Sequence, residues 1–250
     1  MPVLGVIPAR LGSTRLPRKP LQLLGGVPLV IRVAERVRGL GCLDALVVAT
    51  DAPDIVRVAE AAGFHTVLTA ATHQTGTERV AEVAARAEFT EFDLIVNVQG
   101  DEPFVPEDAV TGAIARVRGG DDVGSAATPL DPALAGDPAR VKVVLDQRGR
   151  ALYFSRAPIP HVRDATDRAD GLYWQHIGIY AYRRNALMAW VALPPTRLEL
   201  AERLEQLRAL QHGMTFGIAR LQAPAFPGID TPEDLRRAEA HWQETQGVTI

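Results

Sequence analysis

Apolar strands and amphipathic helices alternate along the first half of the chain, and this order restricts the fold more than any other feature. Leu4–Ile7 is a short apolar run that stops at Pro8, whereas apolar residues of Pro28–Arg38 recur at a spacing of three to four, which predicts a helix. The same patterns predict further strands at Ala45–Thr50, His65–Thr69 and Leu94–Val98, and further helices at Pro53–Ala62, Thr77–Ala87 and Pro106–Arg118. We therefore expect an α/β fold with a mostly parallel sheet, helices on both faces, and ligands at the carboxyl ends of the strands.

The second half of the chain reads differently. The patterns predict strands at Gly124–Thr128, Val141–Asp146, Ala151–Ser155 and His176–Tyr182, a Pro- and Arg-rich loop at Ala157–Asp170, and helices at Leu198–His212 and Pro232–Gln243. No repeat or linker separates these elements from the first half. We expect one domain over residues 1–250, with an inserted antiparallel portion at about 130–185.

Composition excludes several classes of function. The chain has 250 residues, a net charge of -3 and no long basic run, so we expect no bulk attraction to nucleic acid. Cys42 is the only cysteine, which rules out an internal disulfide and a cysteine zinc cluster. The first residues lack the order of a signal peptide, and no apolar run reaches the roughly 18–20 residues of a membrane span. We expect a cytoplasmic protein without membrane insertion.

The loop Pro8–Pro20, between the first strand and the first helix, combines glycine, hydroxyl groups and cations. It lacks the spacing of a Walker A loop. Gly12 still allows close backbone approach, and the polar side chains suit a polyphosphate; they are Arg10, Ser13, Thr14, Arg15 and Lys19. A solvated basic loop is the alternative, but the position at a strand's carboxyl end favours phosphate binding.

Two acidic segments are candidates for a magnesium site. Asp101 follows a buried strand in Asn97–Pro103, and magnesium needs only one or two carboxylates besides phosphate oxygens. Alone, this segment also suits an ordinary acidic turn. Asp230 precedes Thr231–Asp234, which reads as a helix start with its N-cap, so a metal role for Asp230 is the less favoured of two readings from spacing alone.

Other polar groups are harder to assign from the residues alone. Thr72–Arg79 suits recognition of a pyrimidine edge through Gly76, and Thr75 with Glu78 also forms a capping-box pattern. Arg156 suits a carboxylate ligand, while a lone histidine such as His176 on a strand is more often structural. Residue patterns do not place Arg156, His176, Tyr180, Glu205 or Gln206 on a substrate.

Taken together, these blocks resemble the 3-deoxy-manno-octulosonate (Kdo) cytidylyltransferases, or CMP-Kdo synthetases. The resemblance runs in order from residue 4 to about 240 and is carried by the segments Ala9–Pro20, His73–Arg79, Val96–Pro103, Val141–Asp146, Ala151–Arg156, His176–Tyr180, Leu204–Arg208 and Gly228–Leu235. The arginine loop is shared with sialic acid synthetases, whereas Tyr153–Arg156, His176–Tyr180 and Leu204–Arg208 together are much more specific.

The resemblance implies a Rossmann-like nucleotidyltransferase fold, usually a homodimer with an inserted dimerisation element. It implies transfer of CMP from CTP to Kdo, with release of pyrophosphate, for lipopolysaccharide biosynthesis. Arg10, Ser13, Arg15 and Lys19 would hold the triphosphate, Gly76, Thr77 and Arg79 would lie near cytosine and ribose, and Asp101 and Asp230 would hold Mg²⁺. Gln99, Arg156, His176, Tyr180, Glu205 and Gln206 would hold the sugar acid. Arg10, Arg15, Lys19, Asp101 and Asp230 would form the catalytic set.

Three positions depart from the family pattern. Thr72 stands where aspartate is common, Thr75 where serine is common, and Arg18 where glycine is common. Two other functions stay open at this point: CMP activation of another acidic sugar, such as a sialic acid or an 8-amino Kdo analogue, and nucleotide binding without catalysis. A structural protein is disfavoured, because it does not need three polar clusters at strand ends.

Overall fold

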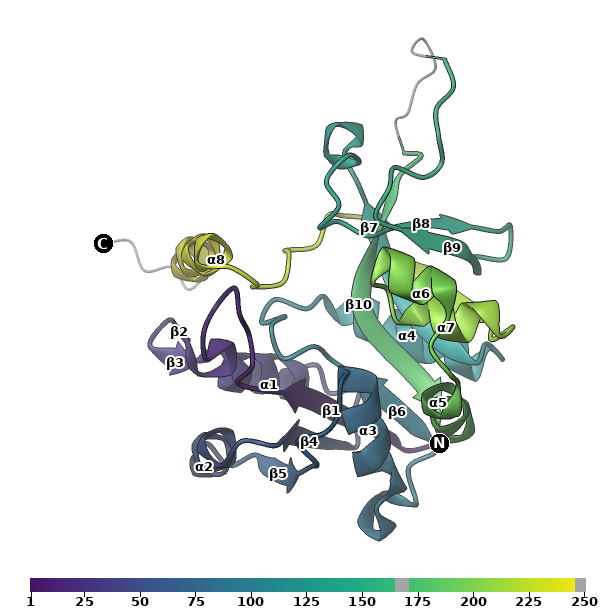
Figure 1. Ribbon diagram of the computed structural model, residues 1–250. Coiled ribbons are helices and arrows are strands. Elements are labelled where there is room, and N and C mark those ends of the chain that lie inside the picture. Colours follow the sequence, from purple (N-terminus) through teal and green to yellow (C-terminus); the bar gives the residue numbers. More distant parts are fainter. Residues whose placement is uncertain (165–170, 246–250) are drawn as a thin grey trace. The chain divides into compact units, whose positions relative to one another are not determined.

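The computed structural model describes residues 1–164 and 171–245 (Figure 1). The last part of the predicted loop Ala157–Asp170 lies outside the described residues. The chain forms two compact units. Unit 1 consists of Met1–Val105 and Phe226–Ile250, and unit 2 of Pro106–Ala225.

A parallel sheet forms the centre of unit 1. Its strands are β1 (Val3–Ala9), β4 (Ala45–Thr50), β5 (His65–Leu68) and β6 (Leu94–Asn97), and they follow the order β6-β1-β4-β5. β1 lies between two partners and is apolar on both faces, with Leu4, Val6 and Ile7 fully buried. This burial on both sides explains why its sequence is a continuous apolar run and not an alternating one.

The order of the strands places a switch point beside β1. The helices that connect the strands are α1 (Leu29–Gly39), α2 (Pro53–Ala61) and α3 (Gly76–Ala85). The chain moves outward from β1 to β4 and β5, and α3 then leads it back across the sheet to β6. Right-handed crossovers that run in opposite directions along a sheet place their helices on opposite faces. A crevice is therefore expected at the carboxyl ends of β1 and β6, where the direction reverses.

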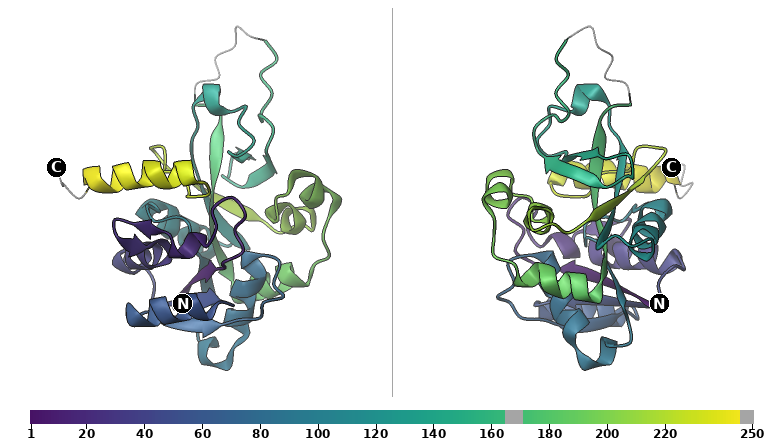
Figure 2. Two further views of the ribbon diagram at one scale, coloured as in Figure 1. Left: turned by 60° about the vertical axis from the view of Figure 1, so that its left-hand side comes forward. Right: turned by 90° about the vertical axis from the view of Figure 1, so that its right-hand side faces the viewer.

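The C-terminal helix of unit 1 packs against a hairpin from the N-terminal part of the chain. After the short helix η1 (Lys19–Leu21), strands β2 (Leu23–Leu24) and β3 (Val27–Pro28) form the hairpin. Helix α8 (Pro232–Thr245) lies beside it (Figure 2). The backbone N–H of Gly25 donates to Glu239 at 2.8 Å, and the Arg32 guanidinium lies 4.0 Å from the Trp242 ring centre. These contacts hold the second half of α8 against the hairpin, and Asp230 lies two residues before the helix begins.

Unit 2 is built around a mixed sheet. Its strands are β7 (Val123–Pro129), β8 (Lys142–Leu145), β9 (Ala151–Ser155), β10 (Trp174–Arg183) and β11 (Phe216–Arg220). β7 pairs in parallel with β11 and antiparallel with β10, while β8 pairs antiparallel with β9 and β10. The segment predicted as an antiparallel insertion therefore does form antiparallel pairs.

Helix α4 (Glu107–Arg118) covers one side of this sheet, and its other helices are α5 (Arg184–Ala192), α6 (Arg197–Glu202), α7 (Gln206–Gln211) and the short η3 (Pro132–Leu134). An aromatic cluster forms part of the core, with Trp190 in edge contact with Tyr180, Tyr182 and Phe216. None of the helices that the structure describes combines the length and the apolar composition needed to cross a lipid bilayer.

Most predicted elements are confirmed with ends shifted by one or two residues, but the single helix at Leu198–His212 was wrong. The backbone leaves the helix at Arg203, whose φ is 54°, so two short helices replace it. The carbonyl groups of Glu202 and Arg203 accept hydrogen bonds from Arg156, and this tertiary contact overrides the helical spacing. The patterns also missed β11, α5 and the β2–β3 hairpin.

Glycine at position 124 allows α4 to approach β7 closely. A Cβ atom added to Gly124 would lie 1.9 Å from the carbonyl oxygen of Ala113. We expect Gly124→Ala to lower the free energy of unfolding by at least the roughly 1–3 kcal/mol that overpacking costs. Gly136→Ala is the matched control, because nothing lies within 4 Å of its added Cβ. Urea denaturation followed by circular dichroism measures both, and equal midpoints would contradict this packing.

Candidate functional site

A polar pocket of about 320 Å³ opens at the carboxyl ends of the unit 1 strands. Three segments line it: the loop after β1, the start of α3, and the loop after β6 together with Asp230. The lining residues are Pro8, Ala9, Arg10, Gly12, Ser13, Thr14, Arg15, Lys19, Pro20, Thr75, Gly76, Arg79, Gln99, Gly100, Asp101 and Asp230. The structure therefore brings together the predicted phosphate loop, most of the predicted base site and both predicted metal ligands.

The loop after β1 presents its cations from a locally ordered backbone. The Ser13 hydroxyl accepts a hydrogen bond from the backbone N–H of Leu16 at 3.3 Å. Arg10 donates to the carbonyl of Gln74 at 3.4 Å, which connects this loop to the segment before α3. Arg10 and Arg15 are exposed, whereas Lys19 is mostly buried, so the loop offers charge both at the rim and inside the pocket.

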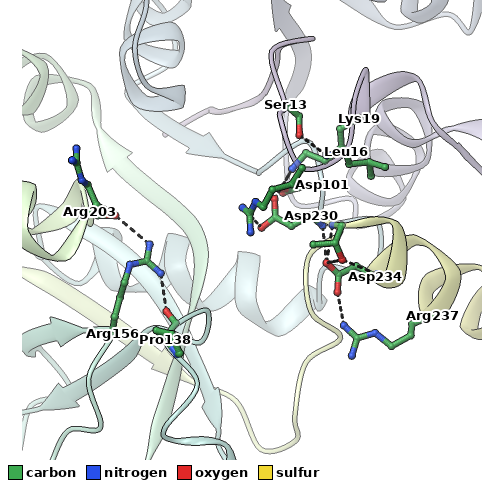
Figure 3. A network of polar contacts seen from close by, with 12 residues as sticks. Ser13, Leu16, Lys19, Asp101, Pro138, Arg156, Arg203, Asp230, Asp234 and Arg237 are labelled. Atoms are coloured by element: carbon green, nitrogen blue, oxygen red, sulfur yellow. Dashed lines mark hydrogen bonds and ion pairs between the residues drawn. The ribbon is translucent and has the colours of Figure 1, made fainter.

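One ammonium group joins the two predicted metal ligands (Figure 3). Lys19 Nζ lies 2.5 Å from Asp101 Oδ2 and 3.0 Å from Asp230 Oδ1. Arg15 Nη2 lies 3.0 Å from the other oxygen of Asp230. The carboxylates follow β6 and precede α8, so this bridge connects three segments that are distant in the sequence.

Close backbone approach makes this arrangement possible. A Cβ atom on Gly100 would lie 2.9 Å from the carbonyl oxygen of Pro8, so only glycine lets the β6 loop come this near to β1. The backbone N–H of Ile229 donates to the carbonyl of Asp101 at 2.9 Å, which places Asp230 beside Asp101. Asp234 then caps α8 by accepting hydrogen bonds from Thr231 at 2.9 Å (N–H) and 2.7 Å (hydroxyl).

The carboxylates shift the pKa of their neighbours. Burial alone would lower the pKa of Lys19, but the charges and hydrogen bonds of Asp101 and Asp230 raise it above its ordinary value, so Lys19 stays cationic. Burial, together with the negative charges of Asp101 and Asp230, raises the pKa of Glu102 to about 8. Glu102 therefore carries a proton at neutral pH, and its side chain is a third carboxyl group beside the two aspartates. Sequence patterns did not identify this role.

The start of α3 forms another wall of the pocket. The predicted capping box is present, since Glu78 N–H donates to the Thr75 hydroxyl and the Glu78 carboxylate accepts from the Thr75 N–H. Arg79 is buried, donates to the Thr69 hydroxyl and lies 3.5 Å from Asp51. Asp51 and Thr69 were not predicted for this site, although both follow strands directly. Thr77 is buried and is not among the lining residues.

The two aspartates fit magnesium. Within residues 1–164 and 171–245, no group of three or more His, Cys, Asp or Glu side chains is arranged to hold a metal ion. However, oxygens of both Asp101 and Asp230 lie within 3.0 Å of a single nitrogen, so one cation can reach both. Magnesium takes one or two carboxylates and fills its remaining positions with water and phosphate oxygens.

The other predicted site residues lie in unit 2, where Arg156 is held by backbone carbonyl groups. Its guanidinium donates to Pro138 O at 2.8 Å and to Arg203 O at 3.3 Å (Figure 3). It also donates to Glu202 O at 2.8 Å. The backbone N–H of Arg156 donates to the Glu202 carboxylate at 2.9 Å. The guanidinium is therefore held rigidly, and any further ligand must share it with these oxygens.

His176 and Tyr180 share one face of β10, as their spacing predicted, with ring centres 5.5 Å apart. Burial lowers the pKa of His176 to about 3, so its imidazole is neutral, and its Nε2 lies 2.9 Å from the Ser125 hydroxyl. Burial, with the charges of Tyr182 and Glu205, raises the pKa of Tyr180. Gln206 is buried at the start of α7, next to Glu205.

Comparisons with known proteins agree with this geometry. A protein-family profile described as cytidylyltransferase matches residues 4–216. A protein of Gemmatimonas aurantiaca named 3-deoxy-manno-octulosonate cytidylyltransferase is 54% identical over 97% of this chain and 95% of its own length. A protein of Polynucleobacter necessarius with the same name is 48% identical over 93% of this chain and 92% of its own length.

Two solved structures are similar. A CMP:2-keto-3-deoxy-manno-octonic acid synthetase complexed with CTP superposes with a TM-score of 0.90 at 37% identity, over 98% of this chain and 100% of the other. A glucose-1-phosphate thymidylyltransferase from Bacillus anthracis superposes with a TM-score of 0.67 at 15% identity, over 97% of this chain and 96% of the other, and supports the nucleotidyltransferase fold alone. With a full-length relative at 54% identity and a family match over residues 4–216, the chain belongs to the 3-deoxy-manno-octulosonate cytidylyltransferase family.

Proposed function

We propose that this protein transfers CMP from CTP to 3-deoxy-D-manno-octulosonate, giving CMP-Kdo and pyrophosphate for lipopolysaccharide biosynthesis. The observation that carries the proposal is one pocket in which a cationic loop faces two carboxylates. The relatives with this name at 54% and 48% identity support the choice of nucleotide and sugar acid.

The reaction is an in-line displacement at the α-phosphorus of CTP. The anomeric hydroxyl of the sugar forms the new phosphorus–oxygen bond, and the bond to pyrophosphate breaks. Arg10, Arg15 and Lys19 bind the triphosphate and neutralise the charge that grows on the departing pyrophosphate. Positioning and charge neutralisation supply the rate acceleration, without a covalent enzyme intermediate.

Asp101 and Asp230 would hold the magnesium ion. When bound, magnesium polarises the α-phosphate and lowers the pKa of the attacking hydroxyl. The two aspartates would hold this charge in the cationic loop's pocket, which their side chains line. Glu102 keeps its proton beside them in the free protein, which limits the negative charge that the pocket must accommodate.

Several finer expectations belong to the proposal as well. Gly76, Thr77 and Arg79 would recognise cytosine and ribose, and Gln99, Arg156, His176, Tyr180, Glu205 and Gln206 would recognise the sugar acid. A cytoplasmic location is part of the proposal, because a sequence with Cys42 as its only cysteine suits a reducing compartment. The homodimer follows from the resemblance.

Pyrophosphate release across a panel of nucleotides and sugar acids tests the function directly. We expect release with CTP and Kdo, and little with ATP, GTP or UTP. Release with a sialic acid or an 8-amino Kdo analogue, and not with Kdo, would reassign the substrate. Binding of CTP without pyrophosphate release for any sugar acid would indicate a nucleotide-binding protein.

Asp101→Asn should abolish turnover while leaving the fold intact, because the amide loses the charge that holds the metal. The matched control is Asp93→Asn, which removes the same charge from an exposed position in unit 1. Steady-state rates over a magnesium titration, with circular dichroism of each variant, measure the effect. Near-normal activity of Asp101→Asn in excess magnesium would remove Asp101 from the metal site.

A further inference from the structure

The groups assigned to the triphosphate and the groups assigned to the metal are paired with each other in this structure. Lys19 bridges Asp101 and Asp230 at 2.5 and 3.0 Å, and Arg15 lies 3.0 Å from Asp230. Two cations therefore neutralise two carboxylates. Each of the two carboxylates thus has a cationic partner.

These contacts conflict with the ligand-bound roles of the same side chains. A magnesium ion sits about 2.0–2.1 Å from its carboxylate oxygens. The ammonium of Lys19 occupies this space between the two aspartates, and two cations this close repel each other. Two of the three Lys19 N–H donors already point at the aspartates, so a full set of phosphate contacts requires the ammonium to turn away from them. Binding of a metal ion between Asp101 and Asp230 therefore requires the Lys19 ion pairs to open.

We propose that the site works by exchange of ion-pair partners, with the Lys19 ammonium occupying the metal position until the triphosphate arrives. This inference rests on the proposed function. On binding, Lys19 and Arg15 transfer from the aspartates to phosphate oxygens, and Asp101 and Asp230 transfer to the divalent cation. Each charge keeps a partner of opposite sign throughout, so no bare carboxylate pair forms in the pocket.

The local structure allows the side chains to move while the backbone stays. The backbone at Lys19 is fixed by hydrogen bonds from Leu21 N–H to Arg18 O at 2.9 Å and from Gln22 N–H to Lys19 O at 3.1 Å. The Lys19 side chain has a flexible four-carbon stem, which can reorient its ammonium about this fixed point. Arg15 and Asp230 are 62% and 44% exposed, so their pair opens readily to solvent.

The exchange couples the two ligands. A divalent cation meets a competing ammonium in the free protein and a vacated carboxylate pair in the nucleotide complex. Nucleotide therefore raises metal affinity, and by linkage metal raises nucleotide affinity by the same factor. A permanent salt bridge, in contrast, would keep the ammonium in the metal position, so nucleotide would not raise metal affinity.

Binding of Mn²⁺, followed by electron paramagnetic resonance without sugar acid, tests this exchange. The wild-type protein should bind Mn²⁺ more tightly with CTP than without, by a factor within the roughly 5–150-fold range typical of coupled sites, after correction for Mn²⁺ bound by free CTP. Lys19→Met should bind Mn²⁺ more tightly than wild type in the absence of nucleotide, and CTP should then add less.

Arg18→Met is the matched control. It removes a neighbouring positive charge that pairs with Asp54 at 2.7 Å and not with the two aspartates, so its Mn²⁺ affinity should equal that of wild type. Lys19→Met affinity no higher than that of Arg18→Met, or wild-type Mn²⁺ affinity that CTP leaves unchanged, would overturn the exchange. The second result needs no variant, so a folding defect in Lys19→Met does not weaken the test.

The outcome separates this inference from the proposed function. If wild type releases pyrophosphate with CTP and Kdo but Lys19→Met gains no Mn²⁺ affinity, the exchange is contradicted and the proposed function is supported. If Mn²⁺ and CTP bind in a coupled way but no sugar acid gives pyrophosphate release, the proposed function is contradicted and the exchange is supported.

Discussion

The bridge from Lys19 to Asp101 and Asp230 is the interaction on which the site depends. Asp101 lies 82 positions and Asp230 lies 211 positions from Lys19 in the sequence. The bridge therefore joins the segment after β1, the loop after β6 and the residues just before α8. The side chains of Lys19 and Asp101 are only 16% and 23% exposed, so water screens this pair less than a surface pair. The parallel sheet makes the bridge possible by ending β1 and β6 at one edge, and the packing of α8 supplies the third member.

Much of the fold follows from local patterns. Both ends of β4 agree with the apolar run that predicted it, because a strand that is largely buried needs a continuous apolar stretch. Both ends of β9 agree as well, although its Leu152 is exposed. Elements with weaker patterns were missed: β11 mixes Phe216 and Ile218 with glycine and alanine and carries no clear period. The break between α6 and α7 at Arg203 depends on contacts with Arg156, 47 residues away, which no local pattern contains.

Sequence patterns predicted several of the unit 1 residues that line the pocket, but not how these residues pair. Segments that follow the strands were expected to meet at one edge of the sheet, and Arg10, Gly76 and Asp101, from three such segments, do line one pocket. The pairing of cations with carboxylates was not expected, because each group was assigned to a ligand and not to a neighbour. Every residue carries a backbone carbonyl group, so a sequence motif does not indicate which of them accept hydrogen bonds. The three carbonyl contacts of Arg156 were therefore not predicted.

A crystal structure with CTP and Mn²⁺, read by anomalous scattering, tests the central claim most directly. The account predicts one peak about 2.1 Å from oxygens of both Asp101 and Asp230 and in contact with a phosphate oxygen, with the Lys19 ammonium now on the triphosphate. Lys19 still bridging the two aspartates, with the anomalous peak elsewhere, would contradict it.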